Sequence, residues 1–185
     1  MGTIKKSFIG AVTIVAVTLC SAGLSHAADA KAIDAEVDLV LQEFNENIAG
    51  SEDFLKSAKG ILVIPAVYQA GFIWGMRYGK GALRVNGKTV DYYNLVGITF
   101  FLQAGVQQTS LILMFMKDEA LEKFRNSSGF EIGVEAGVTL VAVGGQGSLD
   151  TTRVGEPILA IVFSPRGLMV DLVVQGSKFT KLDLK

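Results

Sequence analysis

The hydrophobic positions of this chain change from a helical to a strand-like period near residue 60. Between residues 33 and 48, apolar side chains recur at spacings of three and four, and carboxylates occupy the opposite face. This spacing predicts an amphipathic helix that packs its stripe on a sheet. A helix lying in a membrane interface would instead carry Lys and Arg on its polar face. The stripe consists of Ile33, Val37, Val40, Leu41, Phe44 and Ile48.

Capping signals predict short helices further along the chain. Ser51 is expected to cap a helix that follows it, with Gly60 in the usual stop position. Asp118 is expected to cap a helix over residues 119–125, and Gly129 follows that helix.

From residue 61 onward the pattern is mainly that of β-strands. Asn86-Gly87 lies between two short runs and is typical of a two-residue hairpin turn, because both central positions require a positive φ. Residues 131–143 and 168–174 alternate apolar and polar positions and predict further strands. Glycines inside such runs permit bends and bulges. We therefore predict an α+β fold: a strongly bent, barrel-like antiparallel β-sheet with an N-terminal amphipathic helix and one or two short helices.

The first residues have the layout of an export signal. Two lysines precede an apolar stretch over residues 8–19, which is shorter than the ~20 residues needed to span a bilayer. Small residues at the −3 and −1 positions predict cleavage before Ala28. We expect residues 1–27 to be a signal peptide and residues 28–185 to form one domain, exported to a periplasmic or outer-membrane-associated location. An uncleaved anchor is the alternative.

Cleavage would remove Cys20 and His26, the one cysteine and the one histidine of the chain. The remaining chain would then lack disulfides, Cys nucleophiles, zinc sites built on thiolate or imidazole, and triads with an imidazole base. We therefore expect no metal and no cofactor. Lipidation of Cys20 is disfavoured, because Leu19 stands before it where small residues are the rule.

A hydrolase built on carboxylates alone is the remaining enzymatic hypothesis, with Glu131, Glu135 and Asp171 as its candidates. Glu131 and Glu135 would lie roughly 13 Å apart on one strand at ~3.3 Å per residue. Paired glycosidase carboxylates are ~5–9.5 Å apart. We therefore expect the chain not to be an enzyme.

Charge is segregated along the chain. Residues 28–53 carry eight acids and one base, whereas residues 54–90 carry six bases and no acid. The second segment, the basic block, also contains Phe72, Trp74 and Tyr78 at even positions. Basic residues beside aromatic residues suit an anionic phospholipid surface. The alternative is that the basic block neutralises the acidic first helix while the aromatic residues are core.

The candidate lipid-binding residues all come from the basic block. Lys80 and Arg84 share a strand face if no bulge intervenes, and Asp91 is a nearby counter-charge. Each Lys or Arg near an anionic membrane contributes about 1 kcal/mol, so a few together suffice for reversible, salt-sensitive attachment. The formal net charge of −1 gives no indication of nucleic-acid binding. The candidates are Lys56, Lys59, Trp74, Arg77, Lys80, Arg84 and Lys88.

Several short blocks occur in a fixed order over roughly residues 34–183. They are Ser57–Ile61, Ala70–Phe72, the glycines Gly75, Gly79 and Gly81, Leu102–Gln107, Leu111–Met114, Phe163–Leu168 and Val173–Ser177. In this order they resemble the SYLF domain family. The resemblance implies association with phospholipids, and eukaryotic members of the family also bind phosphoinositides and actin.

The sequence departs from the family in two places. Thr109-Ser110 stands where many members carry Asp, and the first helix is acidic where lipid-binding eukaryotic members have a basic segment. Phosphoinositide selectivity and actin binding are therefore not expected. The resemblance and the basic block together predict a non-enzymatic phospholipid-binding protein of the cell envelope, attached peripherally to an anionic membrane surface. The alternative is an envelope scaffold that binds a protein partner through a sheet edge or the acidic helix.

Overall fold

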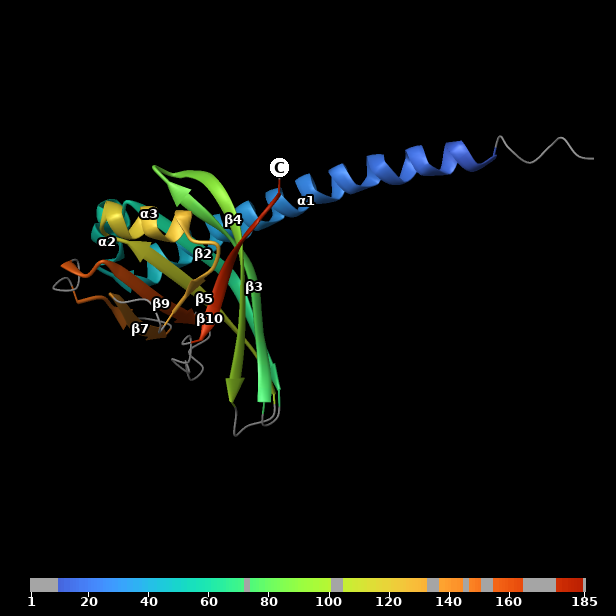
Figure 1. Cartoon of the computed structure of the whole chain (residues 1–185). Coiled ribbons are helices and arrows are strands. Elements are labelled where there is room, and N and C mark those ends of the chain that lie inside the picture. Colours follow the sequence, from blue (N-terminus) through green and yellow to red (C-terminus); the bar gives the residue numbers. More distant parts are fainter. Residues whose placement is uncertain are drawn as a thin grey trace, which may run out of the picture.

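A computed structural model describes residues 10–71, 74–100, 105–132, 137–144, 147–150, 155–164 and 176–184. Within these ranges the fold is α+β, with three helices and an eight-stranded sheet curled into a half-barrel (Figure 1). The helices are α1 (Gly10–Asn47), α2 (Ser51–Ser57) and α3 (Asp118–Asn126). The predicted fold class is confirmed.

The large sheet has the strand order β6-β10-β4-β3-β2-β5-β9-β7. Neighbouring strands are antiparallel except at one edge, where β7 and β9 are parallel. A separate parallel pair joins β1 (Ile48–Ala49) to β8 (Gly147–Ser148). The strands of the large sheet are β2 (Gly60–Gly71), β3 (Trp74–Val85), β4 (Lys88–Phe100), β5 (Gly105–Phe115), β6 (Phe130–Glu131), β7 (Val138–Gly144), β9 (Ile158–Ser164) and β10 (Ser177–Leu182).

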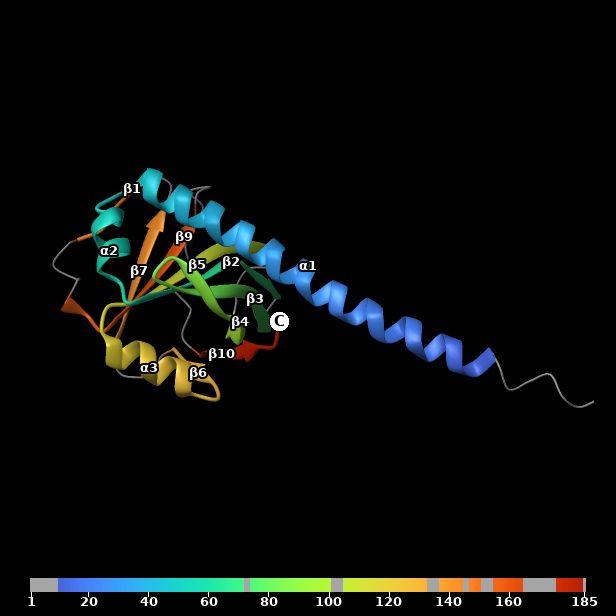
Figure 2. The same cartoon turned by 90° about the horizontal axis from the view of Figure 1, so that it is seen from above.

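The sheet separates two layers of helix. Figure 2 shows α1 lying along one side of the sheet and α3 on the other. We call the side covered by α1 the outer face and the side covered by α3 the inner face. The predicted stripe of α1 is buried at Ile33, Val37, Val40 and Phe44, where it packs against outer-face residues such as Ile112. Amphipathic spacing thus correctly located this contact.

The inner core is organised around Phe124 of α3. Its ring centroid lies 4.8 Å from those of both Tyr93 and Phe115, and 5.2 Å from that of Phe130. Leu121, one turn earlier, is buried in the same cluster. Aromatic pairs at these separations add to the stability gained from burial, so α3 closes the concave side of the sheet.

The sheet bends where β3 passes β2. A Cβ added to Gly79 would lie 2.5 Å from Ile64 Cγ2, so no larger side chain fits without movement. The register of β2 shifts between Ile64 and Val67, and Pro65 at this bulge lacks an N–H to donate. The Ser110 hydroxyl donates to the Pro65 carbonyl at 2.7 Å. Glycine and a bulge together produce the predicted curl.

The hairpin turn at Asn86-Gly87 is confirmed. Asn86 has φ 51° and Gly87 has φ 74°, the left-handed values that a two-residue turn requires. Val85 and Lys88 pair across it.

The prediction of one strand over residues 131–143 is wrong. β6 pairs with β10 at one edge of the sheet, and β7 pairs with β9 at the opposite edge. The chain from Ile132 to Gly137 can span at most about 18 Å, so the curl must bring the two edges close together. Residues 133–136 and the predicted strand at 168–174 lie outside the described residues.

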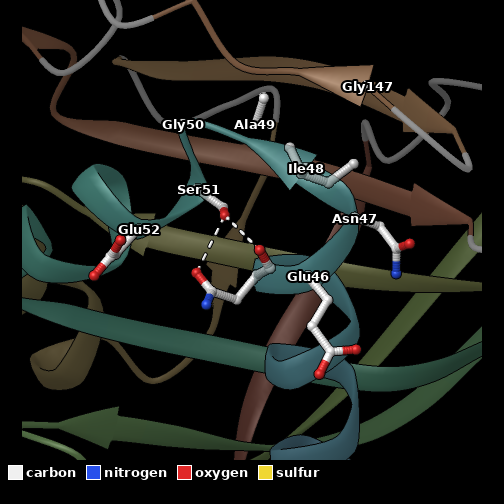
Figure 3. Close-up of a pocket in the computed structure, with 9 residues that line it drawn as sticks. Glu46, Asn47, Ile48, Ala49, Gly50, Ser51, Glu52 and Gly147 are labelled. Carbon is white, nitrogen blue, oxygen red and sulfur yellow. Dashed lines mark hydrogen bonds between the residues drawn. The ribbon is translucent and has the colours of Figure 1, made fainter.

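The predicted helix caps are shifted. Gly50, with φ 84°, is the N-cap of α2, and Ser51 is its first helical residue. The Ser51 hydroxyl instead faces the backbone and side-chain oxygens of Asn45 in α1, at 3.3 and 3.2 Å (Figure 3). Gly60 begins β2 rather than ending α2. Lys117, not Asp118, is the N-cap of α3.

Candidate functional site

The candidate residues of the basic block are spread over the fold. Lys56 lies on α2 and pairs with Glu52 across one helical turn, with Nζ 2.6 Å from Oε1. Lys59 precedes β2 and Lys88 begins β4 at the hairpin turn, and both are exposed. Trp74 begins β3, but its side chain is outside the described part of the chain. These four residues therefore come from four different segments: α2, the residues before β2, the start of β3 and the start of β4.

Lys80 and Arg84 share the outer face of β3, and both reach α1. Lys80 Nζ lies 3.7 Å from Asp29 Oδ2. Arg84 Nη2 lies 2.8 Å from Asp38 Oδ1 and 3.5 Å from Asp34 Oδ1. This geometry agrees with the alternative in which the basic block neutralises the acidic helix, at least at these two positions.

Asp34 is the centre of the polar contact between α1 and β4. Its Oδ1 accepts a hydrogen bond from Thr89 Oγ1 at 2.6 Å, and its Oδ2 accepts one from the Tyr92 hydroxyl at 2.8 Å. Burial, followed by the hydrogen bond to Asp34, raises the pKa of Tyr92 to about 12. Helix α1 is therefore fixed to the outer face by directed contacts as well as by apolar packing.

Arg77 lies on the inner face and is only 3% exposed. Its Nε and Nη2 donate to Gln69 Oε1 at 3.2 and 3.1 Å, and its Nη1 donates to Ser177 Oγ at 3.0 Å. Arg77, Gly97 and Ser177 are in register across β3, β4 and β10. Arg77 is thus an interior residue that connects strands, so its burial argues against the membrane-facing role predicted for it.

Asp91 does not neutralise Lys80 or Arg84. It is nearly buried and pairs with Arg125 of α3, at 3.3 Å from Nε, and with Lys181 of β10. Tyr93 lies two residues further along β4, and burial, followed by the charge of Asp91, raises its pKa to about 12. Its buried hydroxyl has no hydrogen-bond partner among the described residues. Asp91 of β4 therefore connects α3 to the sheet and adds an ion pair to the neighbouring strand β10.

A group of large apolar and aromatic side chains is exposed together on the outer face. In the strand register, Tyr68 is opposite Tyr78, Tyr78 is opposite Val96, and Met76 is opposite Ile98. Met76 and Ile98 are the most exposed, at 67% and 66%. Figure 1 shows β3 and β4 continuing past α1 toward the end of the sheet where β3 begins and β4 ends. We call these residues, Tyr68, Met76, Tyr78, Val96 and Ile98, the outer-face patch.

A groove of about 240 Å³ lies between α1 and the outer face of β2 and β3, next to the outer-face patch. Two tyrosines of the patch form part of its wall, with Lys80 beside them and carboxylates on the α1 side. Its lining includes Asp29, Ile33, Glu36, Tyr68, Tyr78 and Lys80.

Two other cavities lie elsewhere in the described part of the chain. One of about 450 Å³ lies where the chain turns from α1 through β1 into α2, and its charged lining residues are Glu46 and Glu52 (Figure 3). The other, of about 390 Å³, lies beside α3 and contains Arg125 and Lys181, the cations already paired with Asp91.

The described residues contain no cluster of three His, Cys, Asp or Glu side chains placed to hold a metal ion. Of the carboxylates in the hydrolase hypothesis, Glu131 lies in β6 and is partly exposed, while Glu135 and Asp171 fall outside the described ranges.

The described helices include α1, which is 38 residues long. None of them combines the length and the apolar character needed to cross a membrane.

Residues 96–183 match the family model described as "Ysc84: Las17-binding protein actin regulator". Over this segment the chain is similar to the SYLF domain family. The match confirms the family resemblance of the sequence. It begins within β4 and ends just after β10, so Val96 and Ile98 of the outer-face patch lie inside the matched segment. Curated proteins offer no match to this chain.

Proposed function

We propose that this chain is a non-enzymatic phospholipid-binding protein of the cell envelope, attached peripherally to an anionic membrane surface through its outer-face patch. The observation that carries the proposal is the adjacent exposure of Met76 and Ile98 on two paired strands. Contiguous exposed apolar side chains mark sites of membrane or protein interaction. Similarity to a family that associates with phospholipids favours the membrane.

Apolar contact contributes more to this attachment than charge. Burying one large apolar side chain completely stabilises by about 1.5–3 kcal/mol, so a half-exposed one gains roughly 1 kcal/mol. Five such side chains give about 5 kcal/mol, comparable with the marginal, reversible binding of a single myristoyl chain. One lysine near an anionic surface adds about 1 kcal/mol.

Lys80 is the predicted cation that borders the patch, because it is two residues from Tyr78 on the same face of β3. Its pair with Asp29 is 3.7 Å long and both side chains are substantially exposed, so Lys80 can turn toward a phosphate. Arg84 is 15% exposed and held by α1. We therefore expect anionic lipid to strengthen binding modestly, in a salt-dependent way.

Co-sedimentation with vesicles tests the proposal. Residues 28–185, the product of the expected cleavage, keep every side-chain contact described above and are the chain to use. The double variant Met76→Ser/Ile98→Ser should weaken binding to mixed phosphatidylcholine–phosphatidylglycerol vesicles by about 30-fold, given roughly 1 kcal/mol for each side chain.

Leu39→Ser is the matched control, because Leu39 is 60% exposed on α1 and is not part of the outer-face patch. It should bind as the parent does. Thermal unfolding of each variant checks the fold. Unchanged vesicle binding by a folded Met76→Ser/Ile98→Ser variant would contradict attachment through the patch.

Binding of a protein partner through a sheet edge is the second candidate. It is favoured by β7, an edge strand whose free side pairs with no strand among the described residues. An exposed strand edge is a template for strand addition. A purified envelope partner that no longer binds Val141→Pro, but still binds Met76→Ser/Ile98→Ser, would support this candidate.

A further inference from the structure

The groove beside the outer-face patch has walls of opposite charge. Lys80 provides an ammonium group from β3, while Asp29 and Glu36 provide carboxylates from α1. Its volume of about 240 Å³ is smaller than the ~300–1,000 Å³ of pockets for drug-sized ligands. The groove therefore suits a small group that carries both charges.

The tyrosines add a surface that favours a cation. Tyr68 and Tyr78 are directly opposite each other on β2 and β3, and both are about half exposed. Cross-strand partners of this kind have Cβ atoms ~4.5–5.5 Å apart, so the two rings border one space. An ammonium group near such rings is attracted by their faces, and the carboxylates of α1 reinforce that preference.

The contact between Lys80 and Asp29 leaves room for a ligand. Its 3.7 Å separation exceeds the ~3.2 Å limit of a good hydrogen bond, and the Lys80 side chain is 39% exposed. A phosphate can therefore approach Lys80 without breaking a tight ion pair. A purely anionic headgroup would instead also meet the two carboxylates.

We propose that this groove binds the headgroup of a zwitterionic phospholipid, with the phosphate on Lys80 and the ammonium between Glu36, Asp29 and the two tyrosine rings. The inference rests on the proposed function, because Tyr78 leads directly to Val96 and so joins the groove to the surface proposed to enter the membrane. This continuity favours a lipid in a bilayer over a free phosphoester. The groove would add headgroup preference to an attachment driven by the patch.

The test compares binding to vesicles that differ in headgroup, while the outer-face patch of the protein stays the same. Glu36→Gln should weaken binding of residues 28–185 to phosphatidylethanolamine–phosphatidylcholine vesicles on the order of fivefold. Binding to pure phosphatidylglycerol vesicles should stay equal or improve, because a negative charge is removed. Tyr78→Leu keeps apolar area but removes the ring, and should likewise weaken binding only to the zwitterionic vesicles.

Glu43→Gln is the matched control. Glu43 is exposed on α1, about 10 Å along the helix from Glu36 at ~1.5 Å per residue, and does not line the groove. The same shift in lipid preference from Glu36→Gln and Glu43→Gln would overturn the headgroup site in favour of overall charge.

Soluble glycerophosphoethanolamine distinguishes the two proposals. Competition that removes the preference for zwitterionic vesicles, yet leaves binding to phosphatidylglycerol vesicles intact, would support the groove. Failure of that competitor to alter the preference would count against a headgroup site while leaving patch attachment standing. Absence of binding to every vesicle type would overturn both proposals.

Discussion

Arg84 of β3 places its Nη2 atom 2.8 Å from Asp38 Oδ1 of α1 and so joins the basic block to the acidic first helix. The same nitrogen donates to the backbone carbonyl of Asp34 at 3.3 Å. A cation used inside the fold in this way contributes little to an external surface. The segregation of charge along the sequence is therefore explained in part by the ion pairs that hold α1 on the outer face.

Asp34 should contribute more to stability than Asp38, although both accept from Arg84. Asp34 also accepts hydrogen bonds from Thr89 and Tyr92, whereas the Asp38 side chain is 67% exposed. We expect Asp34→Ala to lower the free energy of unfolding by about 2 kcal/mol, since it leaves partly buried donors without a partner. Asp38→Ala should lower it by less than about 0.5 kcal/mol.

Urea unfolding followed by circular dichroism measures both values. Asp53→Ala, an exposed acid on α2, controls for the change in net charge. Equal losses from Asp34→Ala and Asp38→Ala would show that the hydrogen bonds to Thr89 and Tyr92 add nothing in solution.

The free energy of unfolding should depend on pH in the alkaline range, because the Tyr93 hydroxyl is buried. Because the folded-state pKa is raised to about 12 from an ordinary value of 10, unfolded chains lose this proton first. Stability should be intact below pH 10 and fall between about pH 10 and 12, by up to ~1.4 kcal/mol per pH unit for one such tyrosine. Tyr93→Phe should reduce that slope.

The same variant has an expected result at neutral pH. Its lost hydroxyl has no partner among the described residues, so Tyr93→Phe should leave stability unchanged or raise it by about 1 kcal/mol. Unfolding curves at pH 7 and pH 11 provide both measurements. A clear loss of stability at pH 7 would show that the hydroxyl is hydrogen-bonded, for example to a water molecule.

Local patterns predicted the elements that depend on neighbouring residues. The stripe from Ile33 to Phe44 and the turn at Asn86-Gly87 were correct because each follows from side-chain spacing or backbone φ alone. The break between β6 and β7 was missed because alternation continues through residues 131–143 although the two strands pair at opposite edges. Pairing partners depend on the curl of the whole sheet, which no local period encodes.

The exposure of the candidate residues was predicted less well than the fold. Composition placed it in the basic block, but Arg77 points inward and Arg84 docks α1. Met76 and Ile98 were missed because alternating apolar residues normally face a core. One clue was available in the sequence. The opposite face of β3 carries Gly79 and Gly81, which lack side chains, so alternation along β3 does not identify that face as the core.

Gly79→Ala should destabilise the protein without unfolding it. The added methyl group would lie 2.5 Å from Ile64 Cγ2 and 2.7 Å from the Ala66 carbonyl oxygen, so β2 and β3 must separate locally. Overpacking of this kind costs about 1–3 kcal/mol. Gly87→Ala tests backbone strain instead of a steric clash. Open space surrounds the position of its Cβ atom, but its φ is 74°, which residues other than glycine rarely adopt. Comparable thermal stability of parent and Gly79→Ala would contradict the close approach of the two strands.

Arg77→Gln and Lys80→Gln remove the same charge three residues apart and should have opposite effects. Arg77 is 3% exposed and donates to Gln69 and Ser177, so its replacement should lower the free energy of unfolding by about 2–4 kcal/mol. At temperatures where that variant is folded, its vesicle binding should equal the parent's.

Lys80→Gln should leave stability within about 0.5 kcal/mol, because its pair with Asp29 is long and exposed. Its binding to anionic vesicles should weaken about fivefold at low salt and converge with the parent's at high salt. A folded Arg77→Gln variant that binds anionic vesicles more weakly than Lys80→Gln would restore the lipid-contacting role that burial argues against.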